Sequence, residues 1–349
     1  MSNITKKRTT FQVFPLRPVA FATVAALALL LSACGGGGGG STSTASNTGT
    51  NSGSSSTSTS TAATGIPAGT TQVTPTYAPG SVQAAMFAQV NAYRTTCGFP
   101  AVQQNTLLDQ AAQSHAQYMV LNGGIVTDSE TQGKPGFTGA TGQDSADALG
   151  WPSNVFTGRM DGGTGSQSTP SAMGTAMINT WAVGVYHQNG FLWESLMGLG
   201  VANESGASLD SLQIGGDFIS IPQGNEPLTF PCQGVSGLPY GQVAGGELPA
   251  PPNGSASGTG TPVTVVGNLG DQVVLSQASM INTTTGQAVS VVILNSTTDP
   301  NQELGAYEAV AYPTSPLSPN TTYQVNLSGT INGNAFSRSF TFTTGSTLA

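Results

Sequence analysis

Two histidines, His115 and His187, are the only imidazoles in a chain of 349 residues. A Ser-His-Asp triad needs a histidine between a nucleophile and a carboxylate, and neither histidine stands in a pattern that indicates one. No glycine-rich phosphate loop follows a predicted strand, and no two cysteines have the short spacing of a redox pair. The sequence therefore predicts no cofactor-dependent enzyme.

His115 lies in a segment whose apolar residues recur at helical spacing. Leu108, Ala112 and Met119 fall on its side of the predicted helix, and Asn105 precedes that helix as the expected N-cap. This position predicts a core histidine that is hydrogen-bonded inside the domain, with a role as a ligand left as the alternative.

Further periodic segments surround this helix. Apolar residues at helical spacing predict helices over 82–93 and 173–181, and short strand-like runs follow at 196–201 and 212–219. Helices followed by short strands favour an α/β sandwich over a doubly wound sheet.

Beyond this segment the pattern changes to β structure. The stretch 236–260 is rich in Pro, Gly and Ser and has the composition of a linker, whereas 261–346 is predicted to be a small all-β sandwich. Residues 317–323 and 339–345 resemble the last strands of bacterial Ig-like modules. Because no nucleophile or metal cluster stands there, a spacer or adhesive role is favoured. Its predicted strands are rich in Val, Thr, Tyr and Phe and cover 261–266, 289–294, 306–311, 323–327 and 336–342.

The first 33 residues have the features of an export signal. Basic residues at positions 6–8 precede an apolar run at 19–31 that is too short to span a bilayer. The run ends in Leu-Ser-Ala-Cys at Cys34, which resembles the lipobox of bacterial lipoproteins, with an ordinary signal peptide as the alternative. The resemblance implies a lipid on Cys34 that anchors the protein in a membrane. Because Gly35 rather than Asp follows, we expect a cell-envelope location at the outer membrane.

Residues 34–78 contain almost no large side chains, which predicts a disordered tether after the lipidated cysteine. Removal of the signal leaves four Lys and Arg against sixteen Asp and Glu, a net charge of −12 that disfavours nucleic acid as a partner.

Lipidation of Cys34 leaves Cys97 and Cys232 as an even pair in an oxidising compartment. A disulfide between them is predicted, with two free thiols as the alternative.

Several motifs between residues 82 and 218 resemble, in order and spacing, bacterial domains of the CAP superfamily (cysteine-rich secretory proteins, antigen 5 and pathogenesis-related proteins). The resemblance implies secretion and an α-β-α sandwich over 79–235. It also implies a shallow cleft that in many members holds two histidines and two acidic residues able to bind a divalent metal. The motifs are Asn91-Ala92-Tyr93-Arg94, Cys97-Gly98, Asn105, Leu108, Ala111-Ala112, His115-Ala116, Tyr118-Met119, Gly136-Phe137-Thr138-Gly139, Asp144 to Trp151, and Trp181 to His187.

This chain departs from the family at the cleft. The first cleft histidine of the family falls at Asp128, its acidic element falls at 154–158 where no acid stands, and Gly184 replaces its serine. His187 matches the second cleft histidine, and Asp128 and Glu130 complete the candidate cleft. No cofactor is therefore expected, and a divalent metal on His187 and Asp128 is left as a weakly supported alternative.

The first hypothesis is thus a lipid-anchored CAP-domain protein, not an enzyme, that binds an unknown extracellular lipid, glycan or protein. The second is a hydrolase that uses His187 with Asp128 as a general base or a metal-assisted pair. The third is a structural or adhesive protein of the envelope.

Overall fold

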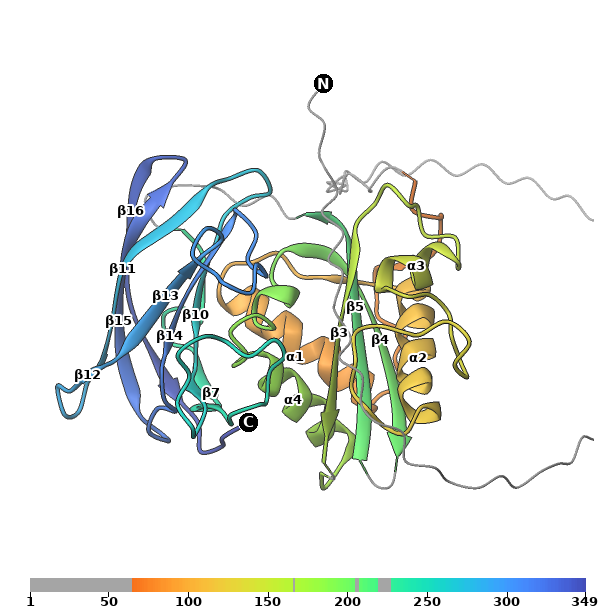
Figure 1. Ribbon diagram of the computed structural model, residues 1–349, viewed down its shortest axis with the longest axis horizontal. Coiled ribbons are helices and arrows are strands. Elements are labelled where there is room, and N and C mark those ends of the chain that lie inside the picture. Colours follow the sequence, from red (N-terminus) through yellow and green to blue (C-terminus); the bar gives the residue numbers. More distant parts are fainter. Residues whose placement is uncertain (1–64, 166, 205–206, 219–226) are drawn as a thin grey trace, which may run out of the picture. The chain divides into compact units, whose positions relative to one another are not determined.

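The computed structural model describes residues 65–165, 167–204, 207–218 and 227–349, all of which belong to one unit (Figure 1). The predicted signal peptide, Cys34 and the tether up to residue 64 lie outside the described residues. Within the described ranges, no helix has both the length and the apolar character that a membrane crossing needs.

A five-stranded sheet forms the centre of the N-terminal part, and helices cover both of its faces (Figure 1). Helices α2 and α3 lie on one face and α1 and α4 on the other, so the predicted α-β-α arrangement is confirmed (Figure 1). In sheet order, the strands are β1 (Thr71–Gln72), β2 (Gln103–Asn105), β4 (Glu194–Glu204), β5 (Ala207–Phe218) and β3 (Thr157–Thr164). The helices are α1 (Val82–Thr96), α2 (Thr106–Leu121), α3 (Gly142–Asp147) and α4 (Pro170–Trp181), followed by the short 3₁₀ helix η1 (Asn189–Phe191).

Local signals explain where the helices begin. The side chain of Asn105 accepts hydrogen bonds from the backbone N–H groups of Leu107 and Leu108, which confirms it as the N-cap of α2. Helix α2 then packs directly on β4, where a Cβ at Gly198 would lie 2.1 Å from backbone atoms of the helix. Glycine is therefore required at Gly198 for this close approach.

The C-terminal part is an all-β region of two packed sheets, as the sequence predicts. One sheet has the order β13-β14-β10-β6 and the other β12-β11-β15-β16-β7. The strands are β6 (Thr229–Phe230), β7 (Ser236–Leu238), β10 (Val263–Val266), β11 (Val273–Asn282), β12 (Ala288–Val289), β13 (Val291–Asn295), β14 (Glu308–Pro313), β15 (Thr322–Ile331) and β16 (Asn334–Thr344).

Two segments expected to be irregular take part in the fold. The stretch 236–260 contains β7, which pairs with β16, and β8 (Gly241–Gln242), which pairs with β9 (Thr259–Gly260). The last part of the predicted tether contains β1, which pairs with β2. Composition did not indicate these strands because backbone hydrogen bonds to a partner strand hold them, and small side chains do not prevent such pairing.

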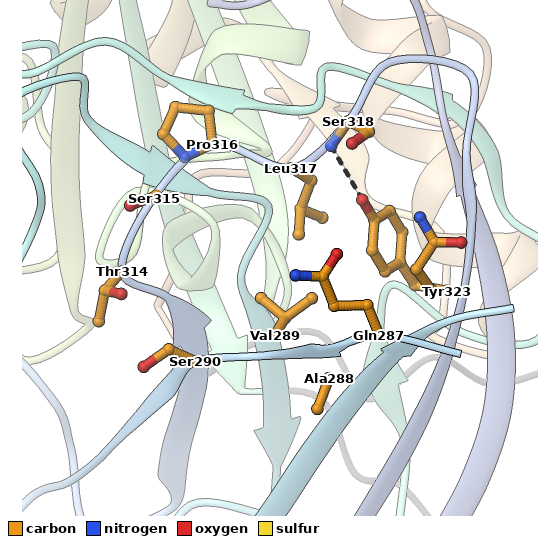
Figure 2. Close-up of a pocket in the computed structure, with 11 residues that line it drawn as sticks. Gln287, Ala288, Val289, Ser290, Thr314, Ser315, Pro316, Leu317, Ser318 and Tyr323 are labelled. Carbon is orange, nitrogen blue, oxygen red and sulfur yellow. Dashed lines mark hydrogen bonds between the residues drawn. The ribbon is translucent and has the colours of Figure 1, made fainter. Parts of the chain in front are cut away.

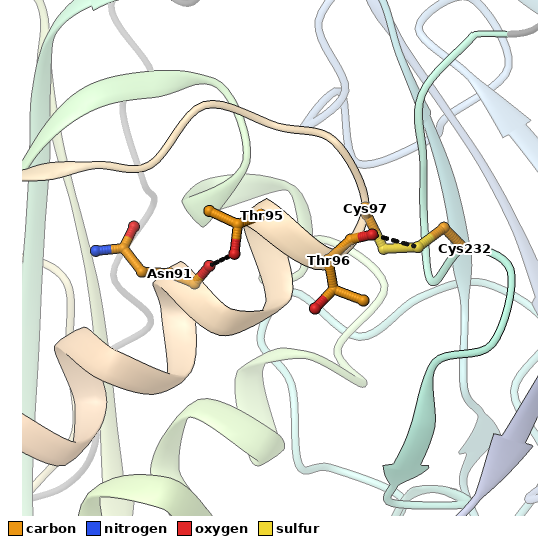
Figure 3. The surroundings of a disulfide bond; sticks show 5 residues. All are labelled: Asn91, Thr95, Thr96, Cys97 and Cys232. Carbon is orange, nitrogen blue, oxygen red and sulfur yellow. Dashed lines mark hydrogen bonds between the residues drawn. A yellow bond between two sulfur atoms is a disulfide. The ribbon is translucent and has the colours of Figure 1, made fainter.

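The α-β-α part and the β-sandwich share one hydrophobic core. Phe230, in the strand that enters the sandwich, contacts the rings of Tyr93 in α1 and Phe191 in η1, with centroids 5.1 and 5.9 Å apart. The predicted disulfide is confirmed: it joins Cys97 at the end of α1 to Cys232 just after β6 (Figure 3). Both parts are therefore tied together by apolar contacts and by a covalent bond.

Candidate functional site

His187 lies in the turn between α4 and η1, and Glu247 binds it. The Nδ1 atom of His187 is 2.8 Å from Oε1 of Glu247, with 16% of the His187 side chain exposed and 1% of the Glu247 side chain. The same carboxylate accepts the backbone N–H groups of Val185, Tyr186 and His187 at 2.7 to 2.9 Å. Glu247 thus holds both the ring and the backbone of this turn.

Gly184 provides the space for that carboxylate. A Cβ at this position would lie 2.8 Å from Oε1 of Glu247 and 3.0 Å from Cβ of His187. The glycine that stands where the family has serine is therefore a steric requirement of the Glu247 contact.

Other acidic side chains also act on His187. Burial lowers the pKa of His187, but the hydrogen bond and charge of Glu247 and the charges of Asp128 and Glu303 outweigh it, so the net pKa is raised. Asp128 is exposed, and its backbone oxygen accepts hydrogen bonds from the Arg159 guanidinium at 2.6 and 3.2 Å. The charge of Asp128, the other predicted site residue, thus contributes to the raised pKa of His187.

Glu130, the third predicted cleft residue, points into the interior instead. Its Oε1 is 2.9 Å from Nδ1 of His115, and its carboxylate accepts the backbone N–H groups of Thr138 and Gly139. Burial raises the pKa of Glu130, but the hydrogen bonds from His115, Thr138 and Gly139 outweigh it and lower the pKa overall. The prediction of Glu130 as a cleft acid is corrected, because its loop folds back onto α2 to satisfy a buried histidine.

His115 is a core histidine, as its helical spacing predicts. It is fully buried, its Nε2 is 2.6 Å from the backbone oxygen of Thr127, and its ring stacks on Tyr118 at 5.7 Å. Nε2 also lies 3.4 Å from the buried carboxyl of Asp161, whose pKa is raised well above the ordinary value by burial. This cluster has no exposed histidine surface to present to a ligand.

Glu247 is the residue that sequence reasoning missed. It is a single acid in a stretch of linker composition, 60 residues beyond His187 in the chain. Neither helical periodicity nor the family motifs reach that position.

Within the described residues, no three His, Cys, Asp or Glu side chains are arranged to hold a metal ion. The carboxylate of Glu247 already accepts four hydrogen bonds.

Residues 87–215 match the model of CAP, the cysteine-rich secretory protein family, and this match supports a CAP-type domain in that segment. The match begins within α1 and ends within β5, so Glu247, Glu303 and the β-sandwich lie outside it. A search of curated proteins found no match to the chain.

Proposed function

We propose that the protein is a bacterial lipoprotein, anchored to the outer membrane through Cys34, whose CAP cleft binds an extracellular ligand without catalysing a reaction. The observation that supports the proposal is the Glu247 carboxylate, whose hydrogen bond and charge raise the pKa of His187 and so oppose its action as a general base. The anchoring follows from the lipobox-like sequence at Cys34.

The electrostatics of the cleft support the same proposal. A general base must be unprotonated at working pH, and the raised pKa of His187 opposes the loss of its proton. The carboxylate of Glu247 contacts this ring, and the charges of Asp128 and Glu303 act on it as well, so the region offers a polar ligand a histidine together with acidic groups. Such a surface recognises a ligand without needing to transfer a proton.

The proposal is tested by assaying the purified protein and its His187→Ala variant against a chromogenic ester and a casein substrate. We expect both proteins to give the background rate, with Asp147→Asn as a control for handling and purity. Turnover by the wild type that disappears in His187→Ala would refute the non-catalytic function.

One observation favours a second candidate, a hydrolase. A carboxylate that accepts the Nδ1 proton of a histidine orients the ring and leaves Nε2 free to act as a base, and Glu247 and His187 have this arrangement at 2.8 Å. A hydrolase of this kind would gain activity as His187 loses its proton. A rate that rises with pH and is lost in both His187→Ala and Glu247→Gln would establish it.

A further inference from the structure

A pocket of about 290 Å³ opens in the β-sandwich, away from the CAP domain match. Its walls are the segment 287–290 around β12 and the segment 314–318 that follows β14, with Asn282 and Tyr323 completing the lining (Figure 2). None of these residues carries a charge.

Two polar groups and two apolar side chains face the centre of this pocket (Figure 2). The hydroxyl of Tyr323 accepts a hydrogen bond from the backbone N–H of Ser318 at 2.8 Å, and it donates to none of the described residues. Its proton thus has no acceptor among the described residues, and Tyr323 is part of the pocket lining. The ring is 2% exposed and stacks on Phe342 with centroids 6.0 Å apart, so the hydroxyl is held in place before any ligand binds.

The side-chain amide of Gln287 offers a further donor and acceptor in the lining of the pocket. Among the described residues it has no hydrogen-bond partner, and it points toward Leu317 and Tyr323 (Figure 2). Val289 and Leu317 supply an apolar surface between the polar groups. The pocket therefore pairs uncharged donors and acceptors with a small apolar floor.

We infer that this pocket binds one unit of a neutral saccharide. A sugar ring has hydroxyl groups at its edge and apolar C–H groups on its faces, which match the amide, the phenol and the apolar floor. Pockets for small ligands begin at about 300 Å³, so a volume of about 290 Å³ suits a single sugar ring. The absence of charge in the lining disfavours an ionic ligand, and a peptide strand would use backbone groups rather than these side chains.

The inference goes beyond the proposed function, because it names a ligand class for a second site of an extracytoplasmic binding protein. It concerns a different site from the CAP cleft, and binding in solution does not depend on lipid anchoring. Loss of saccharide binding with intact labelling of Cys34 would thus overturn this inference alone. Binding without labelling would overturn the proposed anchoring alone.

The test is saturation-transfer NMR of the purified full chain with cellobiose and with di-N-acetylchitobiose at millimolar concentration. We expect transfer to at least one saccharide. Because each lost hydrogen bond costs about 1 kcal/mol, Gln287→Ala and Tyr323→Phe should each raise the Kd about threefold to tenfold. The matched control is Gln277→Ala, an exposed glutamine of the same sheet that does not line the pocket.

Three results would overturn the inference. One is no transfer to either saccharide, and another is transfer that Gln287→Ala and Tyr323→Phe leave unchanged. The third is binding of a neutral blocked tripeptide while both saccharides fail, since that assigns the pocket to peptide. Thermal unfolding of each variant keeps a folding defect separate from a loss of ligand contacts.

Discussion

Replacing Glu308 with glutamine is expected to stabilise the protein at neutral and alkaline pH. Glu308 lies on β14 of the sandwich and is 3% exposed, and Glu194 lies on β4 of the CAP domain and is 1% exposed. Burial raises the pKa of Glu308 from 4.5 to about 7, and burial raises that of Glu194 well above its usual range, with the charge of Glu308 adding to it. The two acids therefore interact where the two parts of the chain meet.

The direction of the pKa shift of Glu308 determines how the stability of the protein depends on pH. Because the folded pKa of Glu308 is above the unfolded value of 4.5, the folded state binds the proton more tightly. The stabilisation of the folded state by protonated Glu308 is fully present below pH 4.5 and is lost as the pH rises through about 7. With 1.36 kcal/mol per pKa unit, the rise from 4.5 to about 7 corresponds to a loss of about 3 kcal/mol.

Glutamine removes the charge and retains an oxygen that accepts the backbone N–H of Gly305, now 2.9 Å from Oε2 of Glu308. Urea unfolding of wild type and Glu308→Gln, from pH 4.5 to about pH 8, measures the effect. We expect the free energy of unfolding of the variant to exceed that of the wild type increasingly as pH rises. Asp147→Asn, in α3 and outside this cluster, should show no such trend. A difference between Glu308→Gln and wild type that is constant with pH would refute the reasoning.

Three further changes test other contacts. Replacing Cys97 and Cys232 together by alanine opens a cross-link with a sequence separation of 135 and should cost up to about 5 kcal/mol; an unchanged melting temperature would contradict the disulfide. Gly184→Ser places a Cβ 2.8 Å from Oε1 of Glu247 and should cost about 1–3 kcal/mol in thermal unfolding, whereas a stable variant would show that the turn adapts. Because Glu247 already occupies Nδ1 of His187, mass spectrometry of the dialysed protein should find little zinc; stoichiometric zinc that His187→Ala abolishes would contradict this.

Local patterns were sufficient for the helices α1, α2 and α4 and for the resemblance to the CAP family. Asn105 caps α2 through its own side chain, and the apolar spacing of Met86, Val90 and Tyr93 corresponds to a buried helix face. These features depend on residues within a few positions of one another. The sequence therefore carried enough information to predict them.

The candidate site depended on distant contacts that no local pattern contains. Glu247 reaches His187 across 60 residues, and Glu130 turns inward because the buried ring of His115 needs an acceptor. The strand β7 forms because β16 offers it a free edge. In each of these cases the role of the residue or strand depends on a partner that is distant in the sequence. The composition around the residue or strand does not identify that partner.

We propose that the protein is anchored in the cell envelope by a lipid, and labelling of Cys34 tests this proposal most directly. Cells that express the wild type or Cys34→Ala are grown with radiolabelled palmitate, and membrane and soluble fractions are compared. We expect label and protein in the membrane fraction for the wild type, and unlabelled protein for Cys34→Ala. Label that persists in Cys34→Ala, or an unlabelled soluble wild type, would contradict the account.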